Sequence, residues 1–161
     1  MESMMDSVTN DDVNEYCRLW REINLQYEEY AKALGTTYSV LLVMSIINSV
    51  GETCTQKDIC SQSFLPKQTV NLIIKSFLKD GFIKMTELES DRRNKVIRFT
   101  KKGKEYVQKY IFRIKDAENR AMKKLSEKDR QQLLESTKSY TTYFKEYMTH
   151  HIEELGNGKR S

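Results

Sequence analysis

The chain has 161 residues and a net charge of +4, with 27 Lys and Arg against 23 Asp and Glu. This length is sufficient for one domain with its own apolar core, without disulfides or a structural metal. A single proline and six glycines favour a helical protein with few turns. The three cysteines are odd in number and irregularly spaced, which argues against a disulfide framework.

The charge is unevenly distributed. Residues 1–30 contain eight acidic and two basic residues, whereas residues 55–104 contain twelve basic and five acidic residues, a net charge of +7. The amino end lacks the basic and apolar regions of a signal peptide, and the apolar clusters around residues 40–47 are too short to span a bilayer. We therefore expect a cytoplasmic protein, with no membrane contact, whose basic middle faces an anionic partner.

The first predicted element is a long amphipathic helix. After a predicted disordered tail over residues 1–9, apolar residues recur every three or four positions from about Asp11 to Leu34, and Gly35 ends the pattern. Such a helix is about 33 Å long and apolar along its whole stripe. It needs a packing partner larger than a small module. A short buried helix follows over residues 38–49.

Two further helices are predicted between residues 55 and 81. Thr55, with Asp58 three residues later, approximates a capping box for a short helix that ends near Ser63. The next helix has Pro66 at its first position and Gly81 at its stop. One of its faces is apolar and the other carries Lys, Gln, Asn and Thr, the residue types that bond to base edges and phosphates.

A basic hairpin follows this helix. Residues 82–88 form the outgoing strand, and Ile97 and Phe99 alternate with Val96, Arg98 and Thr100 on the return strand, a pattern typical of a half-buried strand. Seven basic and no acidic residues lie from Arg92 to Lys104, which suits insertion along a phosphate-walled groove. The alternative is a solvated hairpin. The order of elements favours a winged helix-turn-helix, mainly α with a two-stranded β wing.

Two long helices are predicted after the hairpin. One covers about residues 101–124, and Ser126 with Asp129 marks the start of another that ends near Glu154. Residues 155–161 are a second predicted tail. Three long apolar stripes exceed what a module of about 50 residues can bury. We therefore assign residues 10–34 and 104–154 to a dimerisation region and residues 35–103 to DNA binding, with a monomeric bundle as the alternative.

Residues 55–104 resemble the MarR family of bacterial transcription regulators. The second helix of the family's helix-turn-helix has a sequence pattern that Leu65, Thr69, Val70 and Gly81 match. The family's wing pattern is matched by Asp91, Arg93, Thr100 and Gly103. Phe99 departs from the Leu usual there. The resemblance implies a homodimer with intertwined terminal helices, and an Asp91 carboxylate that pairs with Arg93 and orients it.

This resemblance and the residue types together predict the DNA contacts. Residues expected in the major groove lie on the two helices, and those expected in the minor groove lie on the wing. They are Gln56, Lys67, Gln68, Thr69, Asn71 and Lys75, then Arg92, Arg93, Asn94 and Lys95. The predicted function is a sequence-specific repressor of a pseudo-palindromic operator, released by a small-molecule effector. A winged-helix protein-interaction module without DNA binding is the alternative.

Aromatic residues of the first helices are candidates for an effector pocket, although such stripes are more often plain core. They are Tyr16, Cys17, Trp20, Tyr27, Tyr30 and Tyr38. In the family's peroxide-sensing branch a reactive Cys bonds two Tyr, whose positions match Tyr27 and Tyr38. The Cys position falls on Val13, however, and Cys17 lies one turn later, roughly 5–6 Å away. A packed Cys17 is favoured over a redox sensor.

Signatures of enzymes and metal sites are missing from the sequence. It contains no phosphate-binding glycine loop, no Gly-x-Ser-x-Gly and no His-Glu-x-x-His. The two histidines, His150 and His151, are adjacent and expected to point about 100° apart on a helix, so they are predicted not to share a metal. Cys54 and Cys60 fit small core or interface positions. We expect neither a metal nor a cofactor, and no enzymatic activity.

Overall fold

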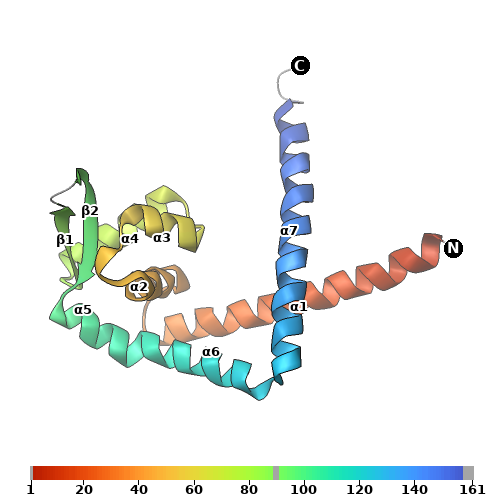
Figure 1. The fold of residues 1–161 in the computed structure, drawn as a ribbon, viewed down its shortest axis with the longest axis horizontal. Coiled ribbons are helices and arrows are strands. Elements are labelled where there is room, and N and C mark those ends of the chain that lie inside the picture. The colour runs from red at the N-terminus through yellow and green to blue at the C-terminus, as the bar shows by residue number, and fades with distance from the viewer. Residues whose placement is uncertain (1, 89–90, 158–161) are drawn as a thin grey trace. The chain divides into compact units, whose positions relative to one another are not determined.

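The computed structural model describes residues 2–88 and 91–157 (Figure 1). Most of it is helical, with one two-stranded antiparallel sheet, which confirms the predicted fold class. In chain order the elements are α1 (Glu2–Ala33), α2 (Tyr38–Val50), the 3-10 turn η1 (Gly51–Thr53), α3 (Gln56–Ser63), α4 (Lys67–Lys79), β1 (Ile83–Leu88), β2 (Asp91–Phe99), α5 (Lys101–Tyr106), the π turn η2 (Val107–Ile111), α6 (Phe112–Lys124) and α7 (Glu127–Asn157). The chain divides into two compact units, one ending at Arg113 and the other beginning at Ile114.

The core lies entirely in the first unit. All buried apolar side chains of the described residues fall between Ala31 and Ile111. They come from the end of α1, from α2, α3, α4, the sheet and η2, and from Cys54 before α3, and the largest fully buried ones are Leu41, Met44, Ile47, Ile59, Ile97 and Ile111. α4 contributes the face predicted from its 3-4 spacing, with Val70, Ile73, Ile74 and Phe77 buried. The helix-turn-helix and the wing therefore share one core with α2 and η2.

Local chemistry sets the limits of α3 and α4. The predicted capping box at Thr55 and Asp58 is present, with both of its reciprocal hydrogen bonds. Pro66 was predicted to be the first helical residue of α4, but it is the N-cap, one position before the helix begins at Lys67. Beyond the C-terminus of α4, Gly81 has a φ of +71°, a conformation that residues with a Cβ adopt only with strain. The amide of Phe82 then donates to the carbonyl of Phe77, 2.9 Å away, and the chain enters β1.

The wing differs from its prediction at one residue. Ile83 pairs with Phe99 and Met85 with Ile97, with an irregularity near Leu88 and Asp91. The prediction that Val96 faces away from the core is wrong, because Val96 and Ile97 are both buried. The chain just before α3 lies along β2, where the amide of Ile97 donates to the carbonyl of Cys54 at 2.7 Å and Thr55 bridges Val96. Residues 54 and 55 therefore cover part of the edge of β2 that does not pair with β1.

Two predicted tails are partly helical. α1 begins at Glu2 and α7 continues to Asn157, so the predicted disorder is wrong for residues 2–9 and 155–157. Residues 2–9 contain no Gly or Pro, the residues that most often interrupt a helix. Only one Gly and no Pro occur in residues 155–157. Residues 1 and 158–161 lie outside the described residues.

The predicted helix over residues 101–124 is interrupted by the π turn η2. Val107 and Ile111 are buried there, and the hydroxyl of Tyr30 on α1 donates to the carbonyl of Tyr110, 3.0 Å away. π turns displace carbonyls from the regular α-helical hydrogen-bond pattern, and this phenol provides a partner. Just before it, α5 packs closely on the wing base, since a Cβ on Gly103 would lie 2.0 Å from the carbonyl oxygen of Phe82.

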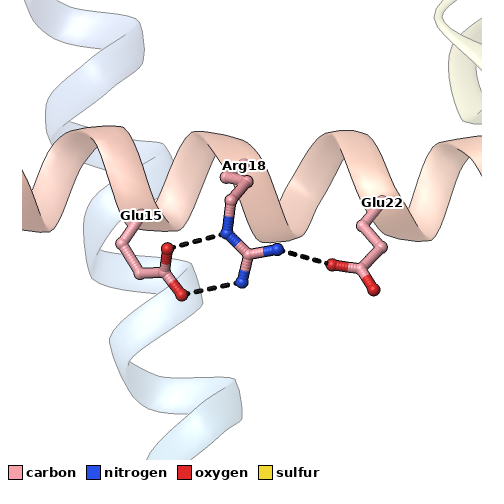
Figure 2. Close-up of polar contacts among 3 residues, drawn as sticks. All are labelled: Glu15, Arg18 and Glu22. Atoms are coloured by element: carbon pink, nitrogen blue, oxygen red, sulfur yellow. Dashed lines mark hydrogen bonds and ion pairs between the residues drawn. The ribbon is translucent and has the colours of Figure 1, made fainter.

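The polar side of α1 is marked by a bridged arginine. Figure 2 shows Arg18 donating through Nε and Nη2 to Glu15, at 2.8 and 2.9 Å, and through Nη1 to Glu22, at 2.9 Å. Trp20 and Ile23 lie on the opposite side at helical spacing and are 59% and 58% exposed. The amphipathic pattern predicted for this helix is present, but its apolar stripe is uncovered in the single chain over this stretch.

No single helix among residues 2–88 and 91–157 has the length and apolar composition of a membrane span, while Asn10–Ala33 and Tyr38–Thr53, bent by 93°, meet that test only as a pair.

Candidate nucleic-acid interface

The start of α4 presents free hydrogen-bond donors. Its first residues are Lys67, Gln68 and Thr69, with Lys67 and Gln68 exposed and Thr69 half-buried. Pro66 offers no side-chain cap, and no acidic residue lies in the first turn. The first N–H groups of a helix lack intrahelical partners and carry partial positive charge. Lys75 is exposed two turns further on. This end of α4 therefore suits an anionic, acceptor-rich partner.

The start of α3 is fixed by its capping box. The Thr55 amide and hydroxyl donate to the Asp58 carboxylate at 2.8 and 2.6 Å, and the Asp58 amide donates to the Thr55 hydroxyl at 3.3 Å. These bonds from Thr55 hold the pKa of Asp58 below its usual range. The box sets the position of Gln56, the first residue of α3. Gln56 is half-buried and donates a hydrogen bond to Asn71 of α4.

A hollow of about 500 Å³ lies between α3, the start of α4 and the wing. Its lining combines three lysines with small polar and apolar residues, and none of these residues is acidic: Thr55, Gln56, Lys57, Cys60, Lys67, Met85 and Lys95. The Nζ of Lys95 also lies 3.7 Å from the Glu87 carboxylate across the hairpin. Predicted contact residues from the helices and the wing therefore meet in one basic hollow.

Arg98 connects the wing to η1, the turn that precedes the helix-turn-helix. Its Nε lies 3.1 Å from the carbonyl oxygen and 2.9 Å from the carboxylate of Glu52, and its Nη1 donates to the Thr86 hydroxyl at 3.3 Å. The sequence indicated only a basic residue on the return strand. Its partner Glu52 lies 46 positions earlier, and no local spacing identifies such a pair.

Four predicted wing residues lie in β2 without described side chains. They are Asp91, Arg92, Arg93 and Asn94. The pairing of Asp91 with Arg93 therefore stays a prediction.

The predicted effector-pocket residues fall into two groups. Tyr27 stacks on Tyr38 at 4.8 Å between ring centroids, and Tyr30 bonds to η2, so these three lie where α1, α2 and η2 meet. Trp20 and Tyr16 are exposed, and Cys17 is half-buried rather than fully packed. Trp20 lies about 10 Å along the helix from Tyr27, so the six residues do not form one cluster in the single chain.

Cys54 fits the predicted core position. It is fully buried, and burial together with the nearby Asp58 raises its pKa to about 11, which makes its thiol a poor nucleophile. Cys60 is half-buried in the basic hollow.

The two histidines are exposed, as expected, and both contact the same carboxylate on α7. The Nδ1 atoms of His150 and His151 lie 3.5 and 3.1 Å from the carboxylate of Glu154. Glu154 follows them by four and three positions, so it lies next to both on the helix surface. The three ligand groups are within 4.8 Å of one another and all are exposed.

Fold and surface together define a winged helix-turn-helix protein, and comparison with known proteins gives its family. A family model described as "MarR family" matches residues 34–94. The chain is 31% identical over 109 residues to the HTH-type transcriptional regulator PapX of Escherichia coli, which covers 67% of this chain and 64% of PapX. It is also 31% identical over 85 residues to the regulator SarZ of Staphylococcus epidermidis, covering 53% and 57% of the two chains. The chain thus spans less than two thirds of the length of these relatives.

Solved structures agree in fold. A MarR family regulator from Neisseria meningitidis superposes with a TM-score of 0.71 at 20% identity, covering 88% of this chain and 96% of that one. The Staphylococcus aureus MepR–DNA complex has a TM-score of 0.64 at 16% identity, covering 81% and 96%. The chain belongs to the MarR family of transcriptional regulators.

Proposed function

We propose that this protein is a sequence-specific DNA-binding regulator that acts in the cytoplasm as a homodimeric repressor and is released from its operator by a small-molecule effector. The observation that supports it best is the uncapped, acid-free start of α4, with Lys67 and Gln68 exposed beside a three-lysine hollow that continues onto the wing. Relatives in fold, such as MepR, have been solved with DNA.

Each element has a distinct role in this proposal. Lys67, Gln68, Thr69 and Lys75 of α4 enter the major groove, where Gln68 bonds a base edge and the lysines neutralise phosphates. Arg92, Arg93, Asn94 and Lys95 reach the adjacent minor groove, and Asp91 orients Arg93. Two such modules in a dimer read half-sites about 34 Å apart, one turn of DNA.

The uncovered apolar surface of both units supports the dimer. On α1, Val13, Trp20 and Ile23 are 42–59% exposed, and on α7, Leu134, Phe144 and Ile152 are 54–62% exposed. Apolar surface repeated along two helices of about 30 residues each exceeds what a monomer usually exposes. A second copy covers it in our proposal. Sedimentation at low micromolar concentration tests this, because a 19 kDa monomer would contradict the dimer.

The effector acts, in this proposal, by changing the distance between the two DNA-binding modules. The junction of Tyr27, Tyr30 and Tyr38 connects α1 to α2 and η2, so a ligand there would contact both the dimerisation and the DNA-binding regions. Redox control through Cys17 is the alternative. It predicts that wild type leaves DNA on treatment with cumene hydroperoxide and that Cys17→Ser does not, whereas effector control predicts that neither protein responds.

Three variants test the DNA contacts against a selected operator and a random duplex at two salt concentrations. Arg93→Ala should weaken binding to both duplexes and make the salt slope shallower by about one. Gln68→Ala should cost about 1–3 kcal/mol on the operator and little on random DNA. Asp91→Ala should weaken operator binding although it adds positive charge, because Arg93 loses its orientation.

The matched control is Arg120→Ala, which removes the same charge from α6. It should leave both affinities and the salt slope close to wild type. Tighter operator binding by Asp91→Ala would contradict the orienting role. No binding of wild type to any duplex at low salt would favour the protein-interaction module.

A further inference from the structure

The two helices of the helix-turn-helix are joined by a pair of amides. Nε2 of Gln56, the first residue of α3, donates a hydrogen bond to Oδ1 of Asn71 in the second turn of α4. Both side chains are half-buried, whereas Lys67, Gln68 and Lys75 of α4 are exposed. Asn71 was predicted to contact the major groove, and its carbonyl oxygen has a partner from the neighbouring helix.

In this bond the oxygen end of the Asn71 amide faces Gln56. A free asparagine presents both an acceptor oxygen and two N–H donors, and it can rotate to suit either need. With Oδ1 turned toward Gln56, the NH₂ group is the end of the amide directed away from α3. Asn71 therefore presents donors to whatever approaches the face of α4.

The backbone of Gln56 is itself held from two sides. Thr55, the residue before it, closes the capping box with Asp58 and bridges Val96 of the wing. The donor of the amide pair thus starts from a position fixed by both α3 and the sheet. A group held in this way before DNA arrives loses little further freedom on binding.

Base edges in the major groove discriminate between the two orientations. Guanine offers two adjacent acceptors, N7 and O6, whereas adenine places its N6 donor beside N7. An asparagine with both amide atoms available suits adenine, and one that presents only donors suits guanine. We propose that Gln56 is a positioning residue that orients Asn71 as a donor group and thereby selects guanine at one operator position. This inference rests on the proposed DNA-binding function.

The experiment is selection from a random duplex library by the full-length protein, with the preferred base at each position determined for wild type and variants. The position read by Asn71 is the one whose preference disappears in Asn71→Ala. Gln56→Ala should lose at least roughly 10-fold of the guanine preference there, within the discrimination that one base contact provides. Gln56→Lys keeps a donor toward Oδ1 and should retain guanine.

Gln56→Glu gives the sharpest readout. A carboxylate only accepts, so it would bond the Asn71 NH₂ and turn Oδ1 outward. The preferred base at that position should then change to one with an amino donor, adenine or cytosine. Because the added charge weakens binding to every duplex, the ratio between bases is compared rather than the affinity. Gln62→Ala, which removes an exposed amide from the same helix, should leave every preference unchanged.

Two results would overturn the inference, and they differ in scope. If Gln56→Ala and Gln56→Glu are folded by thermal unfolding but keep the wild-type preference while binding all duplexes more weakly, the amide pair only braces the two helices. If wild type enriches no sequence from the library, the proposed function fails and the inference fails with it.

Discussion

The winged module and the long helices outside it (α1, α6 and α7, here called the outer helices) differ in how much of their apolar surface one chain buries. Between Ala31 and Ile111, helices, strands and turns contribute to one buried core. Between residues 127 and 156, α7 has no buried side chain, although Leu134, Phe144, Tyr147 and Ile152 are all large and apolar. The winged module thus has a core of its own in a single chain. α7 instead carries large apolar side chains that nothing in the described part of the single chain buries.

Polar contacts differ between the two regions in the same way. Ion pairs of α1 and α6, and the contacts of the two histidines with Glu154 on α7, join positions three or four apart on one helix among the described residues, as in Figure 2 for α1. Such exposed pairs stabilise a helix only slightly. In the winged module, Arg98 reaches Glu52, and Tyr30 of α1 bonds to Tyr110 in η2, so these contacts connect distant elements. The contacts of charged side chains on the outer helices therefore stabilise single helices, whereas those of the winged module fix how its elements pack together.

The largest expected effect comes from charging the uncovered helices. Ile23→Glu combined with Ile152→Glu places carboxylates on two surfaces that are 58% and 62% exposed at those residues in one chain. Burying them in a dimer is costly, so sedimentation should show a monomer. Operator affinity should fall by roughly 100-fold or more, because two linked half-site contacts become one. Lys138→Glu, on an exposed position of α7, is the control and should remain dimeric. A dimer unaffected by both glutamates would contradict this comparison.

Replacing one apolar residue by alanine in each region should affect the free energy of unfolding in different ways. Ile97 is fully buried, so Ile97→Ala should lower the free energy of unfolding by about 2–5 kcal/mol at any protein concentration. Leu134 is 60% exposed, and Leu134→Ala should act only through dimer formation. Urea unfolding at two protein concentrations separates the two. A concentration-independent loss for Leu134→Ala would mean that the single chain buries it.

A smaller effect is expected at the base of the wing. The Cβ of Gly103→Ala would lie 2.0 Å from the Phe82 carbonyl oxygen and 2.7 Å from the Phe99 ring, so α5 must shift. Overpacking of this kind costs about 1–3 kcal/mol, measurable by urea unfolding. Gly156→Ala is the matched control, since nothing lies within 4 Å of its Cβ. Equal stabilities of the two variants would show that α5 moves without cost.

The smallest effect concerns the capping box. Because the folded-state pKa of Asp58 is lowered, its contribution is present above the unfolded pKa, about 4, and is lost as the pH falls through the folded value. Asp58→Asn should therefore cost about 1 kcal/mol at pH 7 and almost nothing near pH 2. Urea unfolding at both pH values measures the difference, and Asp116→Asn on α6 controls for general charge effects. A pH-independent cost would assign the effect to packing.

Local patterns allowed most of the fold to be predicted. The capping box at Thr55 and Asp58, the stop at Gly81 and the 3-4 spacing of α4 each depend on residues within a few positions of one another. Propensity and capping act over that range. The basic, polar face of α4 was predicted for the same reason, since one helix repeat places Lys67 and Lys75 on one side.

Contacts between distant segments could not be predicted. Val96 is buried because residues 54 and 55 lie against β2, some 40 positions away along the chain. Arg98 and Glu52, and Gln56 and Asn71, are pairs that only the folded chain brings together. The contacts of His150 and His151 with Glu154 are different in kind, because they are local and their spacings of four and three positions could have indicated them.

The segment that lies along β2 also bears on aggregation. A two-stranded ribbon has two open edges, and each is a template for strand pairing with another molecule. Residues 54 and 55 cover the edge at Val96 and Ile97, and the other strand, β1, carries the exposed charged residues Lys84 and Glu87. Charged edge strands discourage such pairing. Pairing of two molecules through the sheet is therefore disfavoured, which leaves the helices as the surface for the proposed dimer.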